Sequence, residues 1–254
     1  AHCQTNSEDA IFLATQQAQL QGYEAAATAW VLAAGLHVLS FSFLNPACWT
    51  TRAMFSLATS HFLLFLLSIR SLCVGVTEGR LESTPFQQLN LGMAASAFLA
   101  LLITISKFIL QGVVEIAVPL TSVVASAVTL VVSLRVWQLS VLPSHHLRCT
   151  NPHVGPVEKA FMAALDGITT TAKQFVTPLR ANGVVYRVMA LVFAGQAVAA
   201  LMNPALVLSF VHLAPPFIDR VDVAMLAWAP ALMYQAFAAF SLACAGDDER
   251  LSET

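Results

Sequence analysis

Residues 62–67 read Phe62-Leu63-Leu64-Phe65-Leu66-Leu67, six apolar side chains in a row. A strand of a transmembrane β-barrel alternates apolar and polar residues over about ten positions, so this run favours a helix. The run lies within residues 53–69, which contain no Asp, Glu, Lys or Arg. Further stretches without a charged residue lie at 25–51, 83–106, 116–134, 188–218 and 223–246.

The charge-free stretches are long enough to predict membrane spans. A helix of about 20 apolar residues crosses a hydrocarbon core of about 30 Å. We therefore expect an all-α, polytopic transmembrane helical bundle with about six spanning helices and one amphipathic surface helix. Arg70 lies near the end of the second span, from where its long side chain can reach the membrane interface. The predicted spans are residues 25–44, 53–75, 88–109, 113–135, 186–211 and 223–245.

The composition also points to a membrane solvent. Of the 254 residues, 57% are hydrophobic and only 10% are charged, whereas soluble domains carry about 25% charged residues. The mean hydropathy is +0.72, and 12 basic against 14 acidic residues give a net charge of −2. These values exclude a soluble enzyme, a disordered chain and a basic nucleic-acid-binding protein.

The predicted spans divide the chain into five segments. Residues 1–24 form a polar N-terminal segment with a surface helix that leads into the first span. Residues 156–176 carry an apolar stripe at helical spacing, which is typical of a helix that lies on a membrane surface or packs against a soluble part of a partner. The segments are 1–24, then membrane helices one to four in 25–137, a loop with the amphipathic helix in 138–182, the last two membrane helices in 183–246, and an acidic tail in 247–254.

The basic residues predict the orientation of the chain. With six spans, nine of the 12 Lys and Arg residues lie on the side of the two termini and three lie on the other side. Short cytoplasmic loops are enriched in basic residues, so both termini are expected on the cytosolic, matrix or stromal side. The sequence begins with Ala1 and not with Met, which is expected of an imported organellar protein after removal of its targeting segment, or of a truncated chain.

Small residues recur every four positions in the third, fourth and fifth spans. In lipid, burial of apolar surface does not drive helices together, whereas small residues allow close approach. We expect these faces to be helix contacts, either within the bundle or with another subunit. The expected contact residues are Gly92, Ser96, Ala100, Thr121, Ala125, Thr129, Ser133, Gly195 and Ala199.

His37 and His61 are the first candidates for binding a cofactor. Each lies 12 residues from a turn centred near residue 49, which places both about 18 Å from that turn and at one depth in the membrane. Imidazole is a ligand for haem iron, and it can hold the magnesium of chlorophyll in the same way. The pair therefore suits one haem b or two pigments, and hydrogen bonds to a nearby hydroxyl or carbonyl group are the alternative.

Gln196 and Gln235 are the deep polar residues of the last two spans. Each amide can hydrogen-bond between helices or ligate a pigment through its oxygen, and the first role is the expected one. Glu115 and Lys107 lie beside a short connection, from where both can reach the interface. No metal site is expected, because the five cysteines form no CxxC pair and the loop histidines lack nearby carboxylate or cysteine partners.

Two Asn-Pro-Ala triplets, Asn45-Pro46-Ala47 and Asn203-Pro204-Ala205, occur in the chain. They resemble the paired triplets of the aquaporin family, which cap two half-helices that meet at the centre of a water pore. The resemblance covers these six residues, and Leu206 follows the second triplet where that family has Arg. Asn-Pro is also turn chemistry, which predicts a turn at the first triplet and a helix kink at the second.

The function that these features favour is a non-catalytic accessory subunit of a large organellar energy-transducing complex. A photosystem or thylakoid assembly fits best, with chlorophyll and carotenoid as cofactors and a mitochondrial inner membrane as the second choice of location. The expected partners are the lipid bilayer and other membrane subunits, with no nucleic acid. The alternatives are a small-solute transporter or channel, and a bis-histidine haem b protein.

Overall fold

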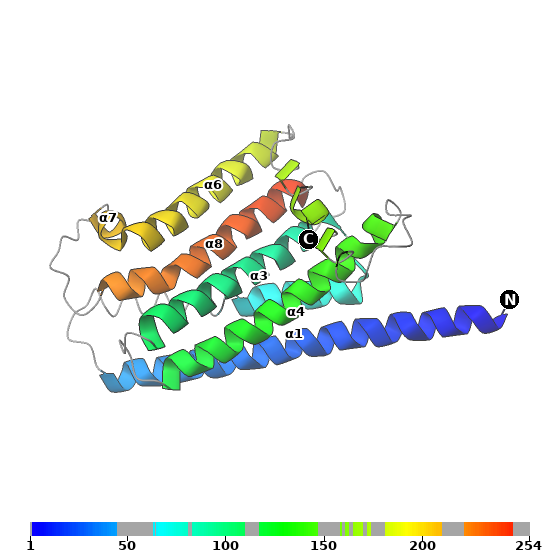
Figure 1. Ribbon diagram of the computed structural model, residues 1–254, viewed down its shortest axis with the longest axis horizontal. Coiled ribbons are helices and arrows are strands. Elements are labelled where there is room, and N and C mark those ends of the chain that lie inside the picture. The colour runs from blue at the N-terminus through cyan, green and yellow to red at the C-terminus, as the bar shows by residue number, and fades with distance from the viewer. Residues whose placement is uncertain are drawn as a thin grey trace.

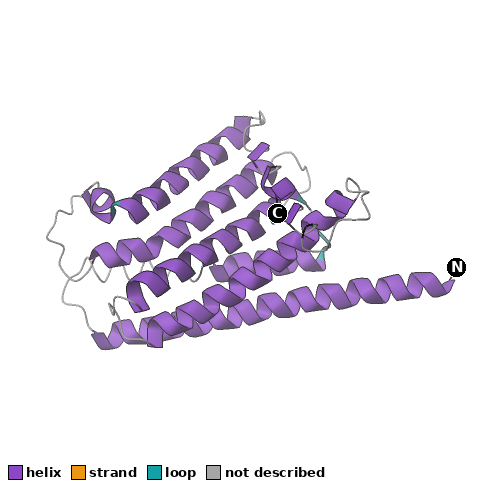
Figure 2. Cartoon of the chain, in the orientation of Figure 1, coloured by secondary structure: helices purple, strands orange, loops and turns teal. Residues whose placement is uncertain are grey.

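The computed structural model describes residues 2–44, 63, 65–80, 83–109, 117–146, 158, 161–162, 165–169, 172–173, 181–209 and 221–245. Over these residues every regular element is a helix and none is a strand (Figure 2). The prediction of an all-α chain is therefore confirmed for the described part of the protein.

Most of the described residues belong to a few long helices. The elements are α1 (His2–Leu44), α3 (Thr84–Ile103), the π-helix η1 (Thr104–Ile109), α4 (Ala117–His146), α6 (Ala181–Met202), α7 (Pro204–Ser209) and α8 (Val221–Ala245). A shorter helix, Phe65–Thr77, lies between α1 and α3 in the sequence. Because η1 follows α3 without a break, residues 84–109 form one rod whose last turns are wider than those of an α-helix.

Five helices lie side by side in the order α6, α8, α3, α4 and α1 (Figure 1). The colours of Figure 1 show that each helix in this layer runs antiparallel to its neighbours. The helix Phe65–Thr77 packs against α1 and α8, because the Phe65 ring lies 4.9 Å from that of Trp30 and 5.2 Å from that of Tyr234, centroid to centroid. These three aromatic residues belong to the largest buried cluster of the described residues.

Three of the described helical segments are long and apolar enough to cross a membrane: Pro85–Ser106, Leu120–Ser140 and Gly183–Met202. They indicate a membrane protein, and they overlap the third, fourth and fifth predicted spans. Helices α1 and α8 run through the predicted spans 25–44 and 223–245. The total of six spans stays a prediction, since residues 45–62 lie outside the described part.

Helix α1 is a single helix of 43 residues. The predicted surface helix over residues 8–23 therefore continues into the first span without a break. Its Ala, Gln, Leu and Glu residues are good helix formers, and no Pro interrupts them. At 1.5 Å per residue α1 is about 65 Å long, about twice the thickness of a hydrocarbon core. Its polar N-terminal half therefore extends beyond the layer of shorter helices, as Figure 1 shows.

The second Asn-Pro-Ala triplet ends one helix and starts another. Helix α6 stops at Met202, and α7 begins at Pro204. The Asn203 side chain oxygen accepts a hydrogen bond from the backbone N–H of Leu206 at 3.1 Å, so Asn203 caps α7. Instead of the predicted kink inside one span over 186–211, the chain has a break, because Pro204 cannot donate to the preceding turn and suits the first turn of a new helix.

Close contacts between helices depend on small residues. A Cβ atom on Gly92 of α3 would overlap the Cβ of Phe237 on α8 and lie 2.7 Å from its Cγ. A Cβ atom on Gly22 of α1 would lie 3.2 Å from Val132 of α4. The contact between α6 and α8 is lined by alanines that are buried on both helices, namely Ala190, Ala197, Ala200, Ala229, Ala239 and Ala243.

Candidate functional site

The two histidines expected to bind a cofactor lie outside the described side chains. His37 belongs to α1, seven residues before that helix ends at Leu44, and His61 precedes the described helix Phe65–Thr77. The predictions of chlorophyll, carotenoid and haem at these residues therefore stay predictions. The side chains of Lys107 and Glu115 lie outside the described part as well.

The two glutamines differ in their surroundings. Gln196 is exposed on the surface of α6, whereas Gln235 is half-buried on α8. Gln196 makes no hydrogen bond with another described residue, so within this part of the chain it does not join α6 to a neighbour. Its expected role between helices therefore requires a partner from outside the described residues.

Most of the expected contact residues lie in the interior. Gly92, Ser96, Ala125, Thr129 and Ser133 are buried, on α3 and α4. Ala100, Thr121 and Ala199 are half-buried. Gly195 is exposed on α6, and no atom lies within 4 Å of the position of its missing Cβ.

A polar seam runs through the contact of α1 with α3 and α4. The Tyr23 hydroxyl of α1 donates a hydrogen bond to the Asn90 side chain oxygen of α3 at 2.6 Å. The Trp30 indole N–H donates to the Thr129 hydroxyl of α4 at 2.7 Å, and that hydroxyl donates to the backbone oxygen of Ala125 at 2.8 Å. Sequence reasoning missed these pairs, although Asn90 is one of three amide side chains, with Gln87 and Gln88, near the start of a charge-free stretch.

Several buried polar atoms of α3 and α4 have no hydrogen-bond partner among the described residues. They are Nδ2 of Asn90 and the hydroxyl oxygens of Ser96, Ser126 and Ser133. All four side chains are at most 1% exposed. A buried polar atom without a partner costs about 1–3 kcal/mol, so bound water would be favourable at these atoms. Among the described residues the buried polar side chains are uncharged, so the seam offers hydrogen bonding and not acid–base chemistry.

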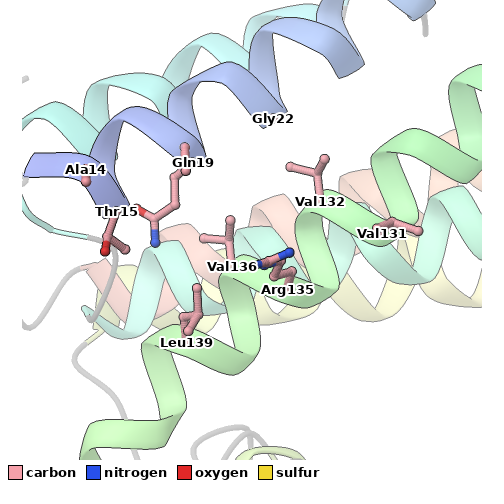
Figure 3. Close-up of a pocket in the computed structure, with 10 residues that line it drawn as sticks. Ala14, Thr15, Gln19, Gly22, Val131, Val132, Arg135, Val136 and Leu139 are labelled. Carbon is pink, nitrogen blue, oxygen red and sulfur yellow. The ribbon is translucent and has the colours of Figure 1, made fainter. Parts of the chain in front are cut away.

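A groove lies between the N-terminal half of α1 and the C-terminal half of α4 (Figure 3). Its volume is about 540 Å³. Figure 3 shows Gln19 reaching from α1 toward α4, with the Arg135 side chain on the α4 side. The groove is lined by Ala14, Thr15, Ala18, Gln19, Gly22, Val131, Val132, Arg135, Val136 and Leu139.

The outer face of α6 is the third candidate surface. Helix α6 packs against α8 on one side, and only 17% of the span Gly183–Met202 is buried inside the protein, against 44% of Pro85–Ser106. At 100° per residue, Gly195 lies at the centre of the exposed face and nearly opposite the buried Ala197. Large apolar side chains surround it at 41–83% exposure, among them Val184, Val188, Met189, Leu191, Val192, Val198 and Met202.

Comparison with protein families, with curated proteins and with solved structures finds no match to this chain. Among the described residues no group of three or more His, Cys, Asp and Glu side chains could hold a metal ion.

Proposed function

We propose that this chain is a non-catalytic integral-membrane subunit of a larger complex, and that the outer face of α6 docks against a neighbouring membrane subunit. The observation that carries the proposal is the placement of Gly195. A glycine in an exposed helix position costs stability, about 1 kcal/mol relative to alanine. A docked helix offsets this cost, because it uses the close approach that glycine allows.

The residues around Gly195 support a helix as the occupant of this face. Ala199 follows one turn later, so the pair forms a Gly-xxx-Ala motif, a spacing at which transmembrane helices associate. Gln196 lies beside Gly195 and is exposed. An amide that faces hydrocarbon is unfavourable, and it becomes favourable when it hydrogen-bonds to a neighbouring helix.

The inner face of α6 shows how this helix packs where it has a partner. Gly183, Ala190 and Ala197 recur at seven-residue spacing, and all three are buried against the rest of the chain. The outer face repeats the pattern of a small residue among larger apolar ones, with Val188, Gly195 and Met202 at the same spacing. Both faces therefore suit helix contacts, and the chain itself covers one of them.

The complex in this proposal is an organellar energy-transducing assembly. A photosynthetic complex is favoured, because His37, His61 and Gln196 are suitable pigment ligands. An absorption spectrum of the protein purified in mild detergent tests this version separately. Chlorophyll and carotenoid bands that decrease in a His61→Ala variant are expected. A folded but colourless protein would remove the pigments and leave the docking proposal intact.

The docking proposal is tested by two matched variants. Gly195 and Gly35 are both exposed helical glycines with no atom within 4 Å of an added Cβ, so a leucine side chain starts in open space at either position. The tagged chain is extracted from its native membrane in mild detergent and run on a native gel. We expect the wild-type chain and Gly35→Leu in a band far above 27.2 kDa, and Gly195→Leu in a band of the free chain.

Two results would contradict the proposal. A wild-type chain that migrates alone in extracts of its native membrane has no stable partner. A Gly195→Leu variant that stays in the large band shows that the partner docks elsewhere than on the outer face of α6.

A further inference from the structure

The groove between α1 and α4 is bordered by a positively charged side chain. Arg135 is exposed, and among the described residues no carboxylate lies within 4.0 Å of its side chain. The Gln19 side chain across the groove also makes no hydrogen bond with a described residue. A cation and an amide, neither of them bonded to a described residue, thus border the same cavity, which is complementary to an anion.

The groove lies at the level where polar and apolar parts of the bundle meet. On the α1 side, Gln16, Gln17, Gln19, Gln21 and Glu24 precede the charge-free stretch that begins at residue 25. On the α4 side, Arg135 lies near the end of the apolar segment Leu120–Ser140. A charged side chain in this position is at the interface of a membrane, where lipid phosphates lie.

An apolar strip leads from Arg135 toward the membrane interior. Val131, Val124 and Leu120 lie one, three and four turns before Arg135 on the same face of α4. Their exposed fractions are 64%, 52% and 54%. The groove therefore continues into an uncovered path that is long enough for an acyl chain and has the cation at its polar end.

We propose that this groove is a binding site for an anionic phospholipid. The phosphate accepts hydrogen bonds from the Arg135 guanidinium group and the Gln19 amide, and one acyl chain lies along Val131 and Val124. A guanidinium group binds phosphate oxygens in a bidentate manner. In phosphatidylcholine the positively charged choline group would compete with Arg135 for the phosphate, so an anionic lipid is favoured. The apolar strip selects a lipid over a soluble anion, because a free phosphate gains nothing from Val131 or Val124.

The test measures lipid selectivity in the full-length protein. The protein is reconstituted into vesicles of phosphatidylcholine that contain spin-labelled phosphatidylglycerol or spin-labelled phosphatidylcholine. The fraction of immobilised label reports lipids held at the protein surface. We expect a clear preference for phosphatidylglycerol in the wild-type protein, with a relative association constant that decreases about tenfold in Arg135→Gln, as for loss of a hydrogen bond between charged groups.

Two control pairs separate the groove from general effects. Arg70→Gln removes an exposed cation on the helix Phe65–Thr77, and it should leave most of the preference unchanged. Ala18→Phe fills the groove and should remove the immobilised phosphatidylglycerol, whereas the neighbouring Gln17→Phe lies outside the lining and should not. Each variant is first shown by circular dichroism to keep the helix content of the wild-type protein.

Three results would overturn the proposal. The first is equal immobilisation of the two labelled lipids by the wild-type protein. The second is an Arg135→Gln variant that keeps the wild-type preference, or an Arg70→Gln variant that loses as much. The third is full displacement of the labelled phosphatidylglycerol by millimolar inorganic phosphate, which would make the groove a site for a soluble anion.

Discussion

Helices α3 and α6 are both long enough to span a membrane, yet their surroundings differ. Helix α3 lies inside the layer between α8 and α4, and 44% of its span is buried, whereas 17% of the span in α6 is buried. In α3 the small and polar residues Gly92, Asn90 and Ser96 all face other helices. In α6, Gly195 and Gln196 face outward. The same residue types are therefore enclosed by neighbouring helices in α3, whereas in α6 the described part of the chain leaves them uncovered.

The largest expected effect comes from adding one methyl group to each helix. Gly92→Ala should destabilise the protein by about 3 kcal/mol, because the new Cβ overlaps Phe237 and α3 must move away from α8. Gly195→Ala should stabilise it by about 0.5–1 kcal/mol, because the position is open and alanine favours a helix. Thermal unfolding in one detergent, followed by circular dichroism, measures both changes. Equal effects of the two substitutions would remove the distinction between the two helices.

The next effect concerns the hydrogen bond between α1 and α3. Tyr23→Phe should cost about 1.5 kcal/mol, because it leaves the Asn90 oxygen without its donor in a fully buried place where Nδ2 already has no partner. The double variant with Asn90→Leu should recover part of the loss, since it removes both unpaired groups. Unfolding in the same detergent is the measurement. A double variant less stable than Tyr23→Phe alone would show that the tyrosine is not the group that Asn90 requires.

The sequence predicts where these helices lie along the chain better than it predicts which helices pack against one another. Charge-free stretches indicate where α3, α4 and α6 lie, and Asn203-Pro204 marks the end of α6. The predicted fourth span ends at Arg135, whereas helix α4 continues to His146, because a long side chain at the interface does not end a helix. Hydropathy records how far a residue prefers to be from water, and it does not record which helix covers it.

The candidate sites show the same limit. The sequence predicts the same role for Gly92 and Gly195, a helix contact within the bundle or with another subunit, and only the order of the helices separates the two cases. Tyr23 and Asn90 are 67 positions apart, so no local pattern joins them. The groove at Arg135 likewise exists because α1 lies beside α4, a neighbour relation that periodicity alone does not determine.

A smaller effect is expected at the second hydrogen bond of the seam. Thr129→Val keeps the shape of the side chain but leaves the buried Trp30 indole N–H without this acceptor, at a cost of about 1 kcal/mol. Thr28→Val is the matched control, because the Thr28 hydroxyl is exposed and, among the described residues, donates only to the Glu24 backbone oxygen. Its unfolding temperature should stay within error of the wild-type value. A loss in the control as large as in Thr129→Val would assign the effect to threonine in a helix and not to Trp30.

The smallest effect on stability is expected at Gln196. Gln196→Leu should change the unfolding free energy of the isolated chain by less than about 0.5 kcal/mol, because the amide is exposed and pairs with no described residue. Gln88→Leu on α3 should cost more, since Gln88 is 2% exposed and takes part in the interior. In native membrane extracts the two substitutions should have the opposite order of effects on association. Gln196→Leu should weaken retention in the large complex. Gln88→Leu should lower the retained amount only because less of the chain is folded. Normalising the native-gel band to folded protein separates these two effects. A Gln196→Leu variant that is destabilised alone but fully retained in the complex would place the amide in the fold of this chain, and α6 would then resemble α3 after all.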